Sequence, residues 1–547
     1  MQKLQTLDYL VFLVYFVVVA GYGYWIYQRK KSAEASTTDF FLAEGSLTWW
    51  AIGASLIASN ISAEQFIGMS GDGFKVGLAI ATYEWMAAAT LLVVGIFFMP
   101  IYLKNHIFTM PQFLNKRYNQ TVSLTMAIFW LLLYVLVNLT SILFLGALAV
   151  STISGIDFTV CMIGLSVFAI FITVGGMKVI GYTDVIQVFF LILGGLATTY
   201  LALDLVSQEF GVSGISGALN TIFENSGDHF HMIFSPGQLS YPDGEGGTKD
   251  AYMYLPGLTV LIGGMWIVNL NYWGCNQYIT QRALGADLKT AREGILFAAF
   301  LKLLMPVIVV LPGIAAYTLY QKGLFQAEMM NSGVLKPDRA YPVLLNLLPV
   351  GLKGLSFAAL TAAIVASLAG KANSISTIFT LDIYKKYVAP EADEKKLVWV
   401  GRVTIVVAMI LAIIISPYMG IDKGGFQFIQ EMTGLVSPGL FAAFLLGFFW
   451  KKTNSAGAMF AIVGGFLLAF SMHNNWLPGA DWSTVPFLDR MGIVFLICVA
   501  VMIALGLWKP SDKGLEIDAS MFRVKGTFAV GAAIVVVVVA ILYTVFW

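Results

Sequence analysis

Long apolar segments recur from one end of this 547-residue sequence to the other, and they limit its fold more than any other feature. Fourteen segments have this character, and a run of 18 or more apolar residues is long enough for a helix to cross a bilayer. Hydrophobic residues make up 58% of the chain and charged residues only 12%, which is too few charges for a soluble globular protein of this size. The sequence therefore predicts an all-α polytopic membrane protein.

The apolar segments set the predicted order of spans and loops. The spans lie near residues 7–28, 46–74, 76–103, 119–150, 157–175, 180–206, 255–281, 293–322, 342–384, 398–418, 428–450, 454–474, 487–507 and 527–546. The ninth is too long for one straight helix, so part of it is expected outside the membrane or on its surface. Two hydrophilic segments, near 207–254 and 323–341, are too short to form an independent soluble core and are expected to be loops.

Basic residues are distributed unevenly between the two sides of the predicted bundle. With the N-terminus outside, 21 of the 32 Lys and Arg residues fall in inside loops and nine in outside loops, while Lys302 and Lys371 fall within spans. Because cytoplasmic loops carry an excess of positive charge, we expect both termini outside the cytoplasm and the chain in the plasma (inner) membrane. The N-terminal apolar run lacks a cleavage site, which favours a retained span over a signal peptide.

The remaining composition argues against several classes of protein. The three cysteines lie in apolar segments and the four histidines lack metal-ligand spacing, so neither a disulfide framework nor a metal centre of that type is expected. A net charge of +1 gives no basic surface for nucleic acid. The chain has no Gly-rich phosphate loop, which argues against an ATP-driven pump, and no organic cofactor is expected.

Polar residues interrupt the second span at its centre. Asn60, Ser62, Glu64 and Gln65 lie within six residues, although a charged group in the middle of a membrane helix costs about 2.5–3.5 kcal/mol. Two interpretations are open: a Ser- and Asn-rich contact between helices, or a broken helix whose freed backbone carbonyls and side chains face a ligand site. The rest of the chain favours the second.

A similar interruption follows five spans later, at residues 265–277 (MWIVNLNYWGCNQ). Broken helices at equivalent places in two five-span halves indicate an inverted repeat, because five is odd and the halves then have opposite topology. This repeat is inferred from spacing alone. The predicted units are an N-terminal span and linker (1–45), a first repeat (46–206), an outer loop (207–254), a second repeat (255–450) and three C-terminal spans (451–547).

Further polar residues within the spans suggest the chemistry of a ligand. Lys302 stands alone in its span, so its ammonium either extends to the membrane surface or points inward, beside a carboxylate such as Glu84. Amides, one carboxylate and one ammonium offer many hydrogen bonds but little net charge, which suits a neutral polyhydroxylated solute. Tyr272 and Trp273 could pack against the C–H face of a sugar, although membrane aromatics are more often plain packing.

An ion site of hard oxygen ligands is a second possibility. Sodium is typically held by carbonyls that are freed at a helix break and by hydroxyls of a facing helix. Ala58 and Ile61 offer the carbonyls, and Ala363 and Ser367 offer a carbonyl and a hydroxyl. The alternative is that Ser367 only bonds its own helix.

Three motifs resemble the sodium/solute symporter family, and especially the bacterial sodium/galactose (sodium/glucose) symporters. They are residues 60–71 (NISAEQFIGMSG), 183–187 (TDVIQ) and 434–439 (GLVSPG). The resemblance covers nearly the whole chain. It implies the LeuT-type 5+5 inverted repeat, with one extra span before the ten-span core and three after it, about 14 transmembrane helices in all.

The resemblance also implies roles for individual residues. Sugar contacts would be Asn60, Gln65, Glu84, Asn269, Lys302 and Gln430. The inner gate would be Tyr272, and the outer gate would be Met69, Tyr83 and Phe426. Sodium, the coupling ion, would be held by Ala58, Ile61, Ala363 and Ser367, with Asp184 on its route to the cytoplasm.

This chain departs from the family pattern at two places. Ala87 replaces a serine of the galactose symporters, and Ala366 stands where the family usually has the first of two adjacent serines, so one hydroxyl is lost at each site. Leu368 and Ala369 also lack hydroxyls, which argues against a second sodium site and predicts one sodium per sugar.

The expected function is sodium-driven import of a monosaccharide by alternating access. The alternative is sodium-coupled import of a polyol such as inositol, or of another small neutral or anionic metabolite. The spans show no catalytic constellation for an enzyme, no output domain for a sensor and no continuous polar lining for a channel. The expected partners are the sugar, sodium and the lipid bilayer; no oligomeric state is predicted.

Overall fold

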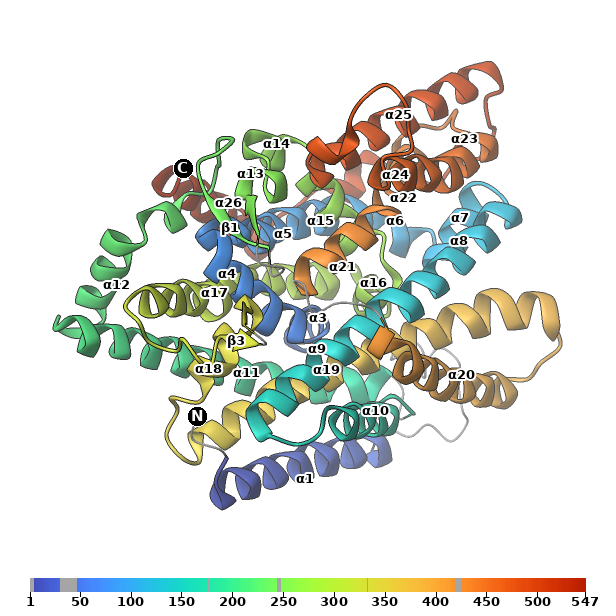
Figure 1. Cartoon of the computed structure of the whole chain (residues 1–547). Coiled ribbons are helices and arrows are strands. Elements are labelled where there is room, and N and C mark those ends of the chain that lie inside the picture. Colours follow the sequence, from blue (N-terminus) through green and yellow to red (C-terminus); the bar gives the residue numbers. More distant parts are fainter. Residues whose placement is uncertain (1–3, 30–46, 175–176, 244–246, 332, 419–424) are drawn as a thin grey trace.

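The computed structural model describes residues 4–29, 47–174, 177–243, 247–331, 333–418 and 425–547, so the predicted linker at 30–45 lies outside the described residues. Helices fill almost all of the described chain (Figure 1). In the first half they are α1 (Thr6–Arg29), α3 (Trp49–Asn60), α4 (Ser70–Val76), α5 (Thr82–Val93), α6 (Met99–Lys104), α7 (Met110–Arg117), α8 (Gln120–Leu132), α9 (Thr140–Ser154), α10 (Phe158–Val174), α11 (Met177–Phe210), α12 (Gly214–Asn225) and α13 (Ala251–Tyr254).

The second half continues in the same way. Its helices are α14 (Gly257–Ile262), α15 (Gly264–Gly274), α16 (Gln277–Leu284), α17 (Leu288–Gln321), α18 (Ala340–Leu345), α19 (Leu352–Thr377), α20 (Glu394–Ile415), α21 (Gly425–Gly434), α22 (Ser437–Phe449), α23 (Ser455–Met459), α24 (Gly465–His473), α25 (Phe487–Trp508) and α26 (Gly526–Val545). Short π- or 3₁₀-helical stretches connect many of them: η2 (Glu64–Met69), η3 (Gly77–Ala81), η4 (Val94–Phe98), η5 (Leu133–Leu139), η6 (Gly227–Phe230), η7 (Pro337–Arg339), η8 (Ile378–Val388), η9 (Ser416–Tyr418), η11 (Phe460–Gly464), η12 (Trp482–Thr484) and η13 (Ala519–Phe522).

Ten helical stretches of the described chain are long and apolar enough to cross a membrane. Two bent pairs raise this number to twelve: Ala251–Ile262 with Gly264–Gly274, bent by 76°, and Gly425–Gly434 with Ser437–Phe449, bent by 50°. All fourteen predicted segments contain helix, but the number of spans stays a prediction. Residues 342–384, which are too long for one helix, divide into α18 and the long α19–η8 stretch.

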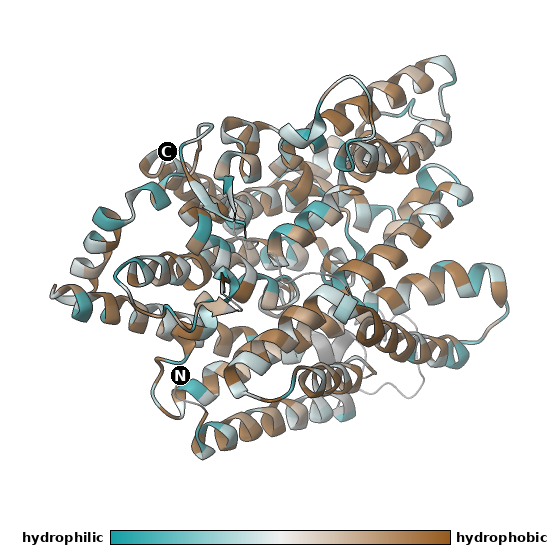
Figure 2. Cartoon of the chain, viewed as in Figure 1, coloured by the Kyte–Doolittle hydropathy of each residue, from teal (hydrophilic) through white to brown (hydrophobic). Residues whose placement is uncertain are grey.

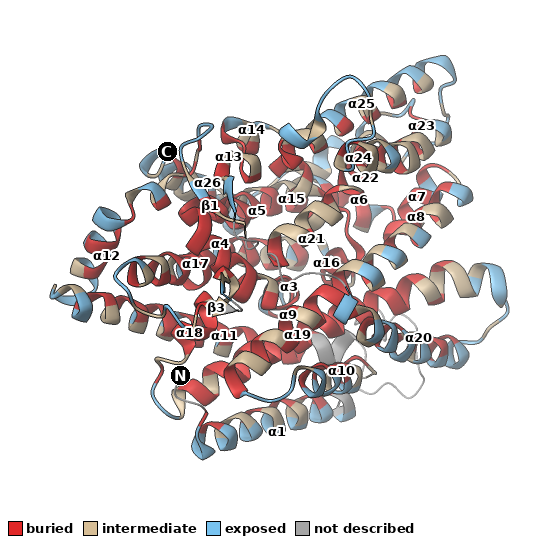
Figure 3. Ribbon diagram, in the orientation of Figure 1, coloured by how far each residue is buried: buried red, intermediate tan, exposed pale blue. Residues whose placement is uncertain are grey.

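The helices form a buried centre and an apolar rim. In the most apolar part of Leu352–Val388, 89% of the residues are buried, whereas the corresponding share for Gly526–Val545 is 22%. Figure 3 shows that α3, α17 and α19 in the middle are mostly buried, while α1 and α20 expose one side. The exposed sides are apolar (Figure 2), as for helices that contact lipid.

The first broken helix is bounded by clear backbone changes. α3 ends at Asn60, Ile61 is extended (φ −85°, ψ 114°), and helical structure resumes at Glu64. Side chains satisfy the freed backbone, since Ser62 N–H donates to Gln65 Oε1 at 3.0 Å and Glu64 N–H donates to Ser62 Oγ at 3.2 Å. The predicted break is therefore present in the structure.

α17 packs along both halves of this broken helix. The contact with α4 is so close that a Cβ added at Gly313 would lie 2.0 Å from the carbonyl oxygen of Ser70. Pro306, inside α17, has no N–H to offer the carbonyl of Lys302, four residues earlier, so the helix ladder is interrupted beside the polar centre.

Two small antiparallel hairpins lie on one face of the bundle. β1 (Ser240–Pro242) pairs with β2 (Thr248–Asp250), with Tyr241 opposite Lys249; β3 (Met330–Asn331) pairs with β4 (Val334–Leu335). We call the side that carries β1, β2 and η7 the hairpin face. The C-terminal end of α26 meets the segment before β1, where Met232 N–H donates to Phe546 O at 2.7 Å.

Candidate functional site

The second predicted interruption is present as a break at Cys275 and Asn276, between α15 and α16. A central cavity lies between this broken helix, the first one, α5, α17, α19 and α21. Its lining includes all six predicted sugar contacts, Asn60, Gln65, Glu84, Asn269, Lys302 and Gln430, and three predicted gate residues, Tyr83, Tyr272 and Phe426. Five further polar residues line it: Glu64, Asn138, Asn276, Lys371 and Thr433. The fourth predicted gate residue, Met69, is fully buried in η2 and is not among the described lining residues.

The ammonium of Lys302 points inward and is bound on two sides. Lys302 Nζ lies 2.5 Å from Glu84 Oε2 and also donates to Asn60 Oδ1. Its side chain is 1% exposed, so it does not extend to the membrane surface, which was the alternative left open. The ring of Trp273 lies below the ammonium, 5.2 Å from Nζ to the ring centroid.

A second pair of opposite charges faces the same cavity. Glu64 and Lys371 interact electrostatically, and Lys371 Nζ donates to Asn138 Oδ1 at 2.8 Å. With two acids and two lysines in its lining, the cavity has no formal net charge. Sequence reasoning noted Lys371 only as a lysine within a span; the available signal was a charged residue in a segment where charge is costly.

Aromatic rings bound the cavity. Tyr83 and Phe426 meet edge to face, with ring centroids 5.0 Å apart, on the side nearer to the hairpin face. Tyr272 is held by its hydroxyl, which accepts from Asn60 Nδ2 at 3.1 Å and is hydrogen-bonded to the hydroxyl of Tyr278. Ala87, which sequence reasoning singled out as a departure from the family pattern, is buried one helical turn beyond Glu84 and is not among the described lining residues.

The predicted sodium ligands lie around the end of α3. Ser367 Oγ donates to Ser59 O at 2.9 Å and lies 3.5 Å from Ala58 O. Because the hydroxyl has only one hydrogen, its lone pairs stay available for a cation. Ala363 lies one helical turn before Ser367 on α19, and Ile61 lies at the break.

Asp184 lies deep in the bundle on α11, beside a buried arginine. Its carboxylate accepts the Ser55 hydroxyl at 2.5 Å and interacts electrostatically with Arg282. Arg282 Nε in turn donates to Ser55 Oγ at 3.0 Å. Arg282 was expected in a cytoplasmic loop, but it belongs to α16 and is 1% exposed. The prediction was wrong because the helix that follows the second break continues inside the bundle.

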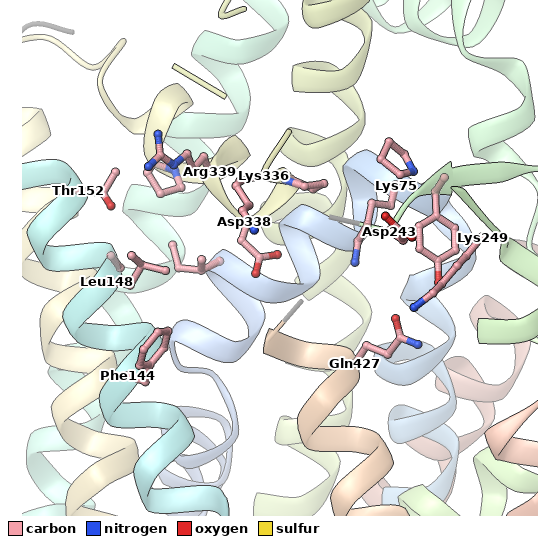
Figure 4. Close-up of a pocket in the computed structure, with 16 residues that line it drawn as sticks. Lys75, Phe144, Leu148, Thr152, Asp243, Lys249, Lys336, Asp338, Arg339 and Gln427 are labelled. Carbon is pink, nitrogen blue, oxygen red and sulfur yellow. The ribbon is translucent and has the colours of Figure 1, made fainter. Parts of the chain in front are cut away.

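A second cavity opens beneath the hairpin face (Figure 4) and is lined by charged side chains. Lys75 was expected in an outer loop, but it is buried at the end of α4 and forms a 2.5 Å ion pair with Asp72. The other oxygen of Asp72 accepts the Tyr254 hydroxyl at 2.8 Å. Asp338, from η7, lies over α4 and accepts Gly425 N–H at 3.3 Å. These contacts join α4, η7, α13 and α21 above the central cavity.

No three His, Cys, Asp or Glu side chains of the described residues gather as they would at a metal centre. The oxygen atoms near Ser367 are instead carbonyls and a hydroxyl, a donor set that suits an alkali ion.

Comparison with known proteins agrees with this architecture. The chain is 45% identical to a sodium/glucose cotransporter of Vibrio parahaemolyticus, over 100% of this chain and 99% of that protein. It is 32% identical to the human sodium/myo-inositol cotransporter 2, over 85% of this chain and 69% of that protein.

Solved structures show the same fold at lower identity. A Na⁺-coupled sialic acid symporter in an outward-open state matches with a TM-score of 0.77 and 22% identity, over 93% of this chain and 99% of that chain. The nucleobase-cation-symport transporter Mhp1 matches with a TM-score of 0.52 and 12% identity, over 88% and 96%. The fold is therefore that of LeuT-type transporters.

The model of the sodium:solute symporter family matches residues 40–465, which is most of the chain. The match includes both broken helices, the central cavity and the helix that carries Ser367. The chain therefore belongs to the sodium:solute symporter family.

Proposed function

We propose that this protein imports a monosaccharide of the galactose or glucose type together with sodium, by alternating access. The observation that carries the proposal is the central cavity, where six polar side chains and three aromatic gate residues surround one space whose charges cancel. A carboxylate, an ammonium and four amides can each pair with sugar hydroxyls, which both donate and accept. The 45% identity to a sodium/glucose cotransporter supports the same substrate class.

Sodium would be held by the carbonyls of Ala58, Ile61 and Ala363 and by the hydroxyl of Ser367. One ion per sugar is proposed, since Ala366, Leu368 and Ala369 offer no side-chain oxygen. Each sodium that enters down a 100 mV potential contributes about 2.3 kcal/mol. At about 1.4 kcal/mol per tenfold, this alone supports a sugar gradient of about fiftyfold, and the sodium gradient adds to it.

The gates would then open in turn. Sodium between α3 and α19 fixes the first broken helix, which presents Asn60 and Gln65 to the sugar. Tyr83, Phe426 and Met69 close toward the hairpin face. Loss of sodium past Asp184, with movement of Arg282 away from Ser55, releases Tyr272 and lets the sugar leave on the opposite side. We place the hairpin face and both termini outside the cytoplasm and the protein in the plasma membrane.

A polyol such as inositol is the second candidate substrate, because the human sodium/myo-inositol cotransporter 2 is 32% identical to this chain. Ala87 has no hydroxyl, and the loss of one hydrogen-bonding partner near a substrate can change how a transporter discriminates between closely related polyols. The same cavity would serve, so only transport measurements separate the two substrates.

The test is uptake of labelled galactose, glucose and myo-inositol into proteoliposomes, with and without an inward sodium gradient. We expect sodium-dependent accumulation of a monosaccharide that Gln65→Ala abolishes, because Gln65 lines the cavity. Accumulation of inositol alone would favour the second candidate. Uptake that is independent of sodium would contradict the proposal.

The ion site has its own control. Ser367→Ala should raise the sodium concentration for half-maximal uptake about fivefold or more, the equivalent of about 1 kcal/mol. Thr361→Val removes another hydroxyl of α19, one that among the described residues donates to Phe357 O of its own helix at 2.8 Å, and should leave the sodium dependence unchanged. Equal effects of the two substitutions would argue against Ser367 as a ligand.

A further inference from the structure

A chain of hydrogen bonds joins the proposed sugar site to the proposed sodium site through two tyrosine hydroxyls. Asn60 Nδ2 lies 3.1 Å from Tyr272 Oη, and the Tyr272 and Tyr278 hydroxyls are bonded to each other. Tyr278 Oη donates to Ser59 O at 2.8 Å. The same carbonyl accepts the Ser367 hydroxyl at 2.9 Å, so one backbone oxygen is shared by the sugar side and the ion side.

The direction of every bond in this chain follows from chemistry. An ammonium can only donate, so Asn60 Oδ1 faces Lys302 and the amide nitrogen faces Tyr272. Tyr278 uses its hydrogen on Ser59 O, so the Tyr272 hydroxyl must donate to Tyr278. All donors therefore point from the sugar site toward Ser59, an arrangement in which each bond strengthens the next.

The chain also crosses the second helix break and ends beside the first. Tyr272 belongs to α15 and Tyr278 to α16, on the two sides of the break at Cys275 and Asn276. Ser59 is next to the last residue of α3. A relative movement of the two broken helices must stretch or break the bond between Tyr278 and Ser59.

Lys371 holds the ring of Tyr278 from the helix that carries Ser367. Its Nζ lies 3.6 Å from the centroid of the Tyr278 ring, a close cation–π contact, and Asn138 fixes it from the other side at 2.8 Å. Because Ser367 and Lys371 are four residues apart, they share one face of α19. α19 thus holds Tyr278 at two points. Lys371 contacts its ring, and Ser367 bonds to Ser59 O, the carbonyl that accepts the Tyr278 hydroxyl.

We propose that Tyr278 is the positioning residue through which sodium at Ser367 sets the position of the Tyr272 gate and of Asn60. This inference rests on the function proposed above. Sodium ligands drawn from α3 and α19 fix Ser59 O beside Ser367, which keeps Tyr278 bonded and therefore Tyr272 and Asn60 in place for the sugar. Without sodium, Ser59 is free to separate from α19, and the chain opens at Tyr278.

The test compares binding of labelled galactose and glucose to the purified protein without sodium and at saturating sodium. The readout, taken for each sugar, is its affinity at saturating sodium divided by its affinity without sodium. This ratio is typically about 5–150 for coupled sites. In Tyr278→Phe we expect sugar and sodium still to bind but the ratio to fall at least about threefold below that of the wild type. By linkage, the effect of sugar on sodium affinity must fall by the same factor, a result that a merely structural defect does not produce.

Tyr118→Phe is the matched control. The Tyr118 hydroxyl is also buried and also donates to a backbone carbonyl, Ala443 O, at 2.6 Å, but it lies outside both sites. This variant should keep the wild-type ratio. If Tyr278→Phe does not fold, Lys371→Met tests the same link, since it removes the ammonium beneath the Tyr278 ring and should reduce the ratio at least about threefold.

A ratio that stays within about twofold of wild type in Tyr278→Phe, or in Lys371→Met where only that variant folds, would overturn the inference. Failure of the proposed function gives a different result, because wild-type protein would then show no sodium-dependent binding of either sugar. If the wild type shows coupling between sodium and sugar and the variant shows the same coupling, the role of Tyr278 is rejected and the proposed function stands.

Discussion

The ion pair between Lys302 and Glu84 is the residue-scale feature with the largest energetic consequence. Both groups are buried and lie 2.5 Å apart, so removing one partner leaves an uncompensated charge, which typically costs about 3–5 kcal/mol. We therefore expect Lys302→Met and Glu84→Gln each to lower the thermal unfolding temperature of the detergent-purified protein substantially. The double variant, which leaves neither charge, should recover most of the loss.

This comparison also separates folding from binding. If the double variant is stable but does not bind sugar, the pair serves the ligand. If the double variant instead loses about the sum of the two single losses, Lys302 and Glu84 stabilise the protein independently of each other, and loss of uptake in a Lys302 variant says nothing about the sugar.

Sequence reasoning reached part of this site. It named Asn60, Glu84 and Lys302 because charged and amide groups are costly in a span and so indicate a function. It gave no role to Lys371, because a single lysine in an apolar segment does not reveal which helix it will face. It also misplaced Arg282, since a loop and a buried half-helix have similar polar compositions.

At the scale of elements, glycine decides how closely α4 and α17 approach. A Cβ at Gly313 would lie 2.0 Å from Ser70 O. This is a backbone atom, which cannot rotate out of the way as the end of a flexible side chain can. Gly313→Ala should therefore destabilise the protein by about 1–3 kcal/mol or more. Gly164→Ala, in α10, has nothing within 4 Å of the added atom and should leave stability unchanged or raise it by up to about 1 kcal/mol, because alanine is favoured over glycine inside a helix. Thermal unfolding of both variants checks this, and equal shifts would contradict the close contact.

The cluster beneath the hairpin face should respond to pH. Burial raises the pKa of the Asp338 carboxyl from 3.8 to about 6, with Lys75 acting in the opposite direction and Asp72 in the same one. Since the folded state holds this proton more tightly than the unfolded state, the contribution of Asp338 to stability rises as the pH falls through about 6 and levels off below about 4. Between pH 7 and pH 5, the unfolding temperature of the wild type should rise relative to that of Asp338→Asn as the pH is lowered.

The difference between the two proteins is the quantity to measure, because the other titratable groups are common to both. A difference that stays constant from pH 7 to pH 5 would show that Asp338 has an ordinary pKa. The cluster itself was not predictable from the sequence: Lys75 and Asp338 are 263 positions apart, and both were assigned to outer loops because hydropathy alone cannot distinguish a solvated charge from a buried pair.

At the scale of the whole molecule, the apolar segments predicted the helical class and the spacing of the two interruptions predicted the repeat. The helical class follows from backbone hydrogen bonding in lipid, which leaves few alternatives to helices, and the repeat follows from the odd number of spans between the two interruptions. The bend of 76° before α15 and the packing of α17 along the first broken helix depend instead on long-range contacts, which a single sequence does not display.

The orientation of the molecule can be tested with the same physical argument that predicted it. The count of basic residues in the predicted loops favours the side opposite the hairpin face as the cytoplasmic one, so we expect Ser235 to face the outside and Ser520 the cytoplasm. Both residues are exposed, whereas the three native cysteines are buried, so the unmodified protein gives a low labelling background. In intact cells, Ser235→Cys should react with a membrane-impermeant maleimide, and Ser520→Cys should react only after permeabilisation. The reverse labelling pattern would mean that the hairpin face lies in the cytoplasm. Asp184 would then lie where sodium enters from outside, not where it leaves.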